Sequence, residues 1–99
     1  MAYETGEFDA NIAAVAGDDP ALRAELLACF AESLNTQTDL LARARCDGNW
    51  HVAAMRLRGL GSSFHAEELV NLADEAMDSA PGDPVVVRKL RYFAERFSG

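Results

Sequence analysis

The sequence predicts an all-α protein, an up-down antiparallel four-helix bundle with an additional short N-terminal helix. Apolar residues recur every three or four positions along most of the chain, which is the spacing of one helix face. The Asp-Pro pairs at 19–20 and 83–84 mark helix starts, because Asp caps free N–H groups and Pro suits the first turn. The only β-branched run, at 85–87, follows one of these pairs, so we place it in a helix.

Five helices are expected, separated by turn residues. Gly17 and Gly82 are chain breakers before the Asp-Pro pairs, and the sequence Asp-Gly-Asn at 47–49 ends the longest helix and turns the chain. Asn49 is expected to cap the helix after it. The expected helices span residues 8–16, 20 to about 45, about 50–64, about 66–78 and 84 to about 97. Connections of about two to five residues favour antiparallel neighbours.

Each expected helix carries an apolar stripe that predicts the core. The predicted core residues are Leu22, Leu26, Leu27, Phe30, Leu34, Leu40 and Leu41; Trp50, Ala53, Ala54, Leu57, Leu60 or Gly61, and Phe64; Leu69, Leu72, Ala73 and Ala76 or Met77; and Val86, Leu90, Phe93 and Phe97.

Length and charge narrow the classes of function. The 99 residues predict a single domain spanning 1–99. Sixteen acidic and nine basic residues give a net charge of −7, which disfavours nucleic acid and anionic membranes and favours a protein or small-molecule partner. The N-terminus does not resemble a signal peptide, and the apolar runs are too short to span a bilayer. We therefore expect a cytoplasmic monomer.

The cysteines and histidines do not predict a metal or cofactor site. Cys29 and Cys46 fall in one expected helix, about 25 Å apart, which excludes a disulfide and suggests small buried or half-buried apolar residues. His51 and His65, about 21 Å apart on a helix, have no paired zinc-ligand spacing with the cysteines. No glycine-rich phosphate loop follows a strand.

The most informative stretch is WHVAAMRLRGLGSSF at 50–64, an expected helix that contains Gly59 and Gly61. An interior Gly costs a helix about 1 kcal/mol relative to Ala, so we expect a close approach by another group at these positions. The stretch resembles the active helix of histidine-containing phosphotransfer (HPt) domains. In that family Ala-Ala-His, any residue, Leu, Lys, Gly is followed by small residues and an apolar-Gly-Ala ending.

The resemblance implies a docking helix that lacks its phosphoacceptor. The Ala-Ala pair at 53–54 is followed by Met55, where the family has its phosphorylated histidine. Arg58 stands where the family usually has Lys, Gly59 matches, and Phe-His-Ala at 64–66 replaces the apolar-Gly-Ala ending. If the position of His65 requires a left-handed backbone, this residue introduces modest strain.

Helical spacing places five residues of this motif on one face, away from the apolar stripe. They are His51, Met55, Arg58, Gly59 and Ser62. The resemblance implies that Arg58 supplies a cation, that Gly59 keeps the surface flat, and that Ser62 is a small hydrogen-bonding residue. A thioether has no nucleophilic nitrogen or oxygen, so Met55 cannot accept a phosphoryl group.

The predicted function is therefore binding without catalysis. We expect a degenerate HPt-like domain of a two-component phosphorelay that binds a response-regulator receiver or a histidine kinase. Three alternatives remain open at this point. Met55 can fill a groove instead of contacting a partner, His51 can act as a displaced phosphoacceptor or as a solvated residue, and the chain can be a structural or dimerising bundle without a signalling role.

Overall fold

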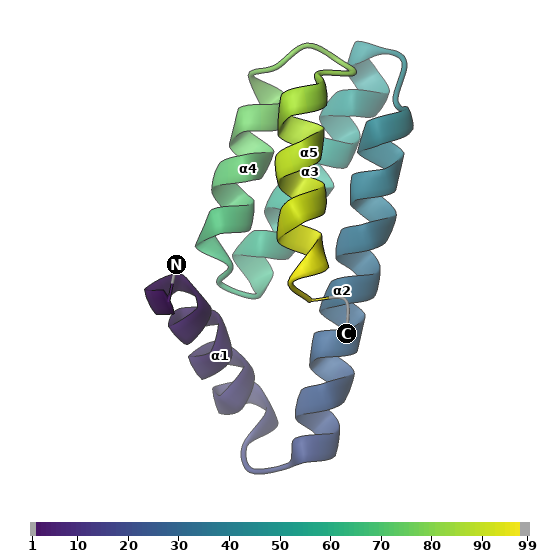
Figure 1. Cartoon of the computed structure of the whole chain (residues 1–99). Helices are drawn as coiled ribbons and strands as arrows, with labels where there is room; N and C mark the ends of the chain where they lie inside the picture. Colours follow the sequence, from purple (N-terminus) through teal and green to yellow (C-terminus); the bar gives the residue numbers. More distant parts are fainter. Residues whose placement is uncertain (1, 98–99) are drawn as a thin grey trace.

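The structure, a computed structural model, describes the backbone of residues 2–97 and the side chains of residues 8 and 10–97. This part of the chain is helical and contains no strand, which confirms the expected all-α class. Its helices are α1 (Ala2–Ala16), α2 (Pro20–Arg43), α3 (Asp47–Ser63), α4 (Glu67–Met77) and α5 (Pro84–Glu95) (Figure 1). The run of three valines at 85–87 lies in α5, as expected.

Helices α2 to α5 run alternately up and down and contact one another in a ring (Figure 1). Each packs against the next along the chain, and α5 closes the ring against α2. The first half of α2 extends past the other three helices, and α1 packs beside it. This arrangement is compatible with the expected bundle and its added N-terminal helix, although α1 begins before residue 8. None of the described helices is long and apolar enough to cross a membrane.

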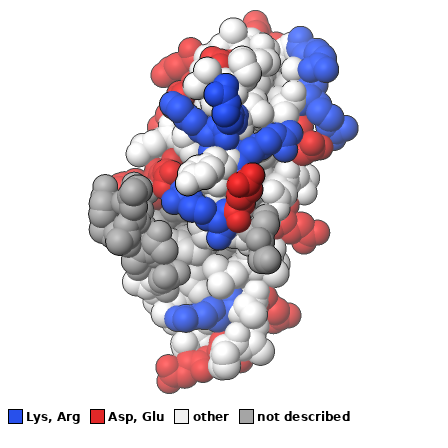
Figure 2. Space-filling model, viewed as in Figure 1, with Lys and Arg blue, Asp and Glu red and all other residues white. Residues whose placement is uncertain are grey.

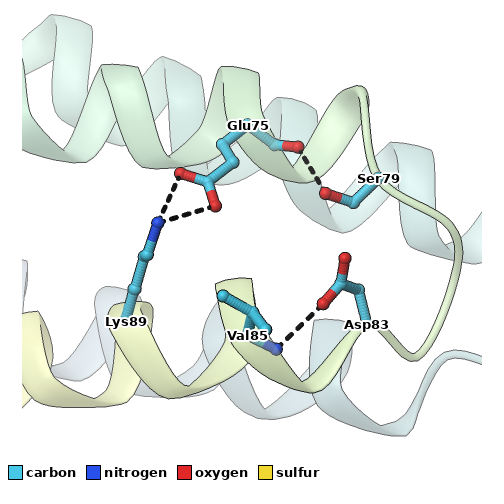
Figure 3. A network of polar contacts seen from close by, with 5 residues as sticks. All are labelled: Glu75, Ser79, Asp83, Val85 and Lys89. Atoms are coloured by element: carbon cyan, nitrogen blue, oxygen red, sulfur yellow. Dashed lines mark hydrogen bonds and ion pairs between the residues drawn. The ribbon is translucent and has the colours of Figure 1, made fainter.

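The expected helix starts at the two Asp-Pro pairs are confirmed. Asp19 Oδ1 accepts hydrogen bonds from two backbone N–H groups of the first turn of α2, at 3.0 and 3.3 Å. Asp83 Oδ1 accepts one from the backbone N–H of Val85 at 2.9 Å (Figure 3). Gly17 and Gly82 have φ angles of 65° and 86°, a backbone conformation that glycine adopts without strain.

The junction between α2 and α3 differs from the prediction. Helix α2 ends at Arg43, and α3 begins at Asp47 with Cys46 as its N-cap, so Asn49 lies inside the first turn and does not cap the helix. The backbone N–H of Trp50 donates to Cys46 O at 3.0 Å, which extends the helix to the earlier start. The Trp50 side chain is buried and its Nε1–H donates to Ala76 O at 2.7 Å, which ties the start of α3 to the end of α4.

The prediction for the cysteines is also wrong in two respects. Cys46 lies between α2 and α3 instead of inside the long helix, and both Cys29 and Cys46 are exposed. Cys29 lies on α2 one residue before the buried Phe30, so its side chain is turned away from the core. Both cysteines are free.

The predicted core is largely confirmed, with exceptions on α2. Leu22 and Leu40 are 37% and 39% exposed, so neither lies in the core. Thr38 takes a core position instead, and its Oγ1 has no hydrogen-bond partner in the described part of the chain. Fully buried core residues include Phe30, Leu34, Leu41, Ala54, Leu57, Leu69, Ala73, Ala76, Val86 and Leu90.

An aromatic cluster attaches α1 to the bundle. The Phe8 ring lies 4.9 Å from that of Phe30, 5.3 Å from that of Phe97 and 6.2 Å from that of Phe64, measured between ring centroids. These partners come from three separate segments of the chain: α2, the residues after α5, and the residue after α3. Phe8 therefore fixes α1 against one end of the four-helix arrangement.

Candidate functional site

The five motif residues predicted to share a face of α3 are all exposed. We refer to His51, Met55, Arg58, Gly59 and Ser62 as the α3 outer face. The Met55 side chain is 54% exposed, so it does not fill a groove of the fold. On the opposite side of the helix Trp50, Ala53, Ala54, Leu57 and Gly61 are buried. The structure thus separates the apolar stripe from the motif residues as the helical spacing predicted.

The two glycines of α3 have different surroundings. A Cβ added to Gly61 would lie 3.0 Å from Val70 Cγ2, 3.0 Å from Val70 N and 3.1 Å from Ala66 O. Two of these atoms are backbone, so they cannot move aside as a flexible side chain would. A Cβ on Gly59 would meet no atom within 4 Å among the described residues. The expected close approach is therefore intramolecular at Gly61, and the fold does not require glycine at position 59.

The close approach at Gly61 follows from the tight turn between α3 and α4. The N–H of Ala66 donates to Gly61 O at 2.7 Å, and the N–H of His65 donates to Ser62 O at 3.3 Å. This pair of bonds is a Schellman motif, in which the residue after the C-cap adopts a left-handed backbone. That residue is His65, with φ 58°, so the left-handed backbone that the sequence analysis considered for this position is present. The turn brings α4 directly against the end of α3 at Gly61, on the buried side of the helix.

Arg58 is not a free cation. Its Nε lies 2.8 Å from Asp74 Oδ1 on α4, and both side chains are about half exposed. An exposed ion pair of this kind contributes about 0–1 kcal/mol. An anion that approaches Arg58 must therefore share the guanidinium with Asp74. Helical spacing does not predict this pairing, because the two residues lie on different helices.

His51 lies one helical turn before Met55, which is about 5.4 Å along the axis. It borders a shallow depression between the start of α3 and the segment that follows α4, together with Met77 and Pro81. Its side chain is exposed. The position of His51 is thus accessible, but it lies farther from Arg58 and Gly59 than Met55 does.

The structure adds residues that the motif did not include. Val52 and Arg56 are exposed next to Met55. They form one helical row with Gly59, and this spacing would have identified them in the sequence. They line an open groove between α2 and α3. We call this the α2–α3 groove, and its lining residues are Gln37, Leu40, Arg43, Ala44, Asn49, Val52, Ala53 and Arg56.

Two polar features of the α2–α3 groove stand out. Arg56 has no ion pair with any described residue, whereas Arg43 Nε lies 3.1 Å from Asp39 Oδ2. The buried Oε1 of Gln37 has no hydrogen-bond partner in the part of the chain that the structure describes. An unsatisfied buried acceptor costs about 1–3 kcal/mol. The groove therefore contains a guanidinium group and an amide oxygen that have no polar partner among the described residues.

The outer face of α5 is also basic, but most of its cations are paired. Figure 2 shows Lys and Arg side chains gathered over α5. Lys89 Nζ lies 3.0 Å from Glu75 Oε2 and contacts both carboxylate oxygens (Figure 3). Arg96 Nη2 lies 2.8 Å from Glu68 Oε2. Only Arg88 on this face has no ion pair with a described residue.

Side chains that could hold a metal ion do not gather elsewhere. No group of three or more His, Cys, Asp or Glu residues has suitable geometry among the residues that the structure describes.

No protein-family profile, curated protein or solved structure matches this chain. The α3 outer face and the adjoining α2–α3 groove are thus the candidate site on structural grounds.

Proposed function

We propose that this chain is an HPt-like domain of a two-component phosphorelay that binds its partner without accepting phosphate. Its architecture is an up-down antiparallel four-helix bundle with an additional N-terminal helix. The α3 outer face docks against a response-regulator receiver or a histidine kinase. The domain is not an enzyme, and it acts by occupying a surface of the partner.

Gly59 is the observation that carries this proposal. It lies inside helix α3, where glycine costs about 1 kcal/mol relative to alanine, and a Cβ there would meet no atom of the described residues within 4 Å. The fold gains nothing from this residue. The role that we assign to Gly59 is to keep the surface beside the exposed Met55 side chain flat, so that a partner can approach the α3 backbone closely.

Because residue 55 is methionine, the partner binds but no phosphoryl group is transferred to this position. Phosphoryl transfer depends on a positioned nucleophile and on charge stabilisation, and a thioether supplies neither a nucleophilic nitrogen nor a nucleophilic oxygen. Methionine is common at protein interfaces because its side chain is flexible and polarisable. Met55 then covers the active-site cleft of the receiver and competes with a true phosphotransfer protein.

The test is to incubate the purified domain with labelled phosphorylated receivers from the same genome. We expect a complex with a dissociation constant on the order of micromolar and no label on the domain. A labelled domain would overturn the proposal. In that case the His51→Ala variant identifies the acceptor, because loss of the label from this variant assigns phosphotransfer to His51.

A second experiment tests whether the α3 outer face accepts phosphate when a histidine is restored at position 55. In Met55→His, the phosphoryl group would leave the receiver aspartate as its acyl P–O bond breaks, and a P–N bond would form to the imidazole. We expect this variant to become labelled and Met55→Gln to remain unlabelled. If no receiver or histidine kinase of the genome binds the parent domain, the chain is a structural bundle and the proposal is wrong.

A further inference from the structure

We propose that the α2–α3 groove receives a carboxylate side chain of the protein partner, bound between Arg43 and Arg56. The inference rests on the proposed function, since it assumes a partner on the α3 outer face. It enlarges that site from one helix to two. It also gives roles to residues outside the motif.

The charges of the groove select an anion. The whole chain carries a net charge of −7, yet the groove is lined by two guanidinium groups and by no Asp or Glu among its described residues. Arg56 has no ion pair with any residue that the structure describes, and Arg43 is 68% exposed although it contacts Asp39. A planar guanidinium matches the two oxygens of a carboxylate, so the pair of arginines forms a natural recognition site for Asp or Glu.

The apolar residues around the groove indicate a protein instead of a free anion. Leu40 and Val52 line the groove and are 39% and 46% exposed, and Met55 lies one turn from Val52. A small anion would leave these side chains in water. A protein surface that presents an acidic residue beside apolar ones would cover them while its carboxylate meets the arginines.

An exposed amide of the groove provides a further contact for a polypeptide. The side-chain Oε1 of Gln37 is buried without a hydrogen-bond partner among the described residues, whereas Asn49 lies exposed on the groove wall. The Asn49 amide offers a donor and an acceptor, which is what partner backbone groups require.

Cross-linking can locate the carboxylate directly. The chain has a single lysine, Lys89, and its ammonium already pairs with Glu75. The Arg56→Lys variant adds an amine in the groove, and a carbodiimide then joins it to any carboxylate in contact. We expect a new cross-link from position 56 to an Asp or Glu of the bound receiver or kinase, mapped by mass spectrometry. Arg88→Lys on α5 is the matched control and should add no intermolecular cross-link.

Binding measurements provide a second readout. We expect Arg56→Gln to weaken the partner complex about tenfold and to reduce its salt dependence, because one charge-assisted contact is lost. Arg88→Gln removes the same charge from another exposed arginine that has no ion pair with a described residue, and it should leave affinity within twofold of the parent. Thermal unfolding of both variants should match the parent, since neither residue is buried.

The outcomes separate this inference from the proposed function. If the parent binds a receiver or kinase while Arg56→Gln binds equally well and no cross-link forms at position 56, the groove inference is overturned and the docking function stands. If the domain alone binds succinate in the groove, and Arg56→Gln abolishes this without affecting the partner complex, the groove is a small-anion site. If the parent binds neither class of partner, both proposals are wrong.

Discussion

The two faces of α3 differ in how much of their sequence the fold explains. On the inward face Trp50, Leu57 and Gly61 each have a structural cause: a buried hydrogen bond, complete burial, and a close approach by α4. On the outward face Met55 is half exposed, and a Cβ added to Gly59 would meet no atom of the described residues within 4 Å. Both faces belong to one helix, so helix propensity cannot account for the difference. The residues that folding leaves unexplained are therefore the better guide to function.

The first way to test this contrast is a pair of truncations on opposite faces. Leu57→Ala should lower the free energy of unfolding by about 2–5 kcal/mol, because Leu57 is fully buried and its removal leaves a cavity. Met55→Ala should change it by no more than about 0.5 kcal/mol. Chemical denaturation of the two variants measures both values. Similar losses would mean that Met55 supports the fold and that the two faces are not distinct.

The second test concerns the glycine that the fold requires. Gly61→Ala should destabilise the protein by about 1–3 kcal/mol, because the new methyl group would press on the backbone of α4 at Val70 and Ala66. Gly48 is the matched control, since it lies in the same helix and a Cβ there meets nothing within 4 Å among the described residues. Gly48→Ala should leave the unfolding midpoint unchanged or raise it.

The third test concerns the glycine that the fold does not require. Gly59→Ala should raise the free energy of unfolding by about 1 kcal/mol, because alanine is the better helix former and the methyl group has room. The same variant should bind the receiver or kinase more weakly, since the methyl group lies on the docking surface. Denaturation and titration calorimetry on one sample compare the two effects. A variant that is more stable and binds unchanged would remove the main support for docking at this position.

The sequence was most informative where one local signal decides the structure. The Asp-Pro pairs set the starts of α2 and α5 through single side-chain caps. The apolar spacing identified the buried side of α3, and the ending of the motif drew attention to the left-handed backbone at His65. Each of these features depends on residues a few positions apart, so periodicity and capping rules capture it.

Features that depend on two distant segments were missed. The start of α3 was placed too late, because Asp-Gly-Asn is a strong turn signal locally and the burial of Trp50 against Ala76 overrides it. The Arg58–Asp74 ion pair and the α2–α3 groove likewise join residues from different helices. Leu40 was assigned to the core, because the spacing of α2 alone does not show which side its neighbours cover.

The smallest expected effect concerns the ion pair that joins the outer face of α3 to α4. Arg58→Gln and Asp74→Asn should each change the free energy of unfolding by at most about 1 kcal/mol, because both side chains are about half exposed to solvent. Their effects on partner binding should have opposite signs. Loss of the guanidinium removes a docking cation, whereas loss of the carboxylate frees Arg58 for an acidic group of the partner. Titration of the receiver or kinase with the two variants measures this, and equal weakening by both would show that the ion pair only holds α3 against α4.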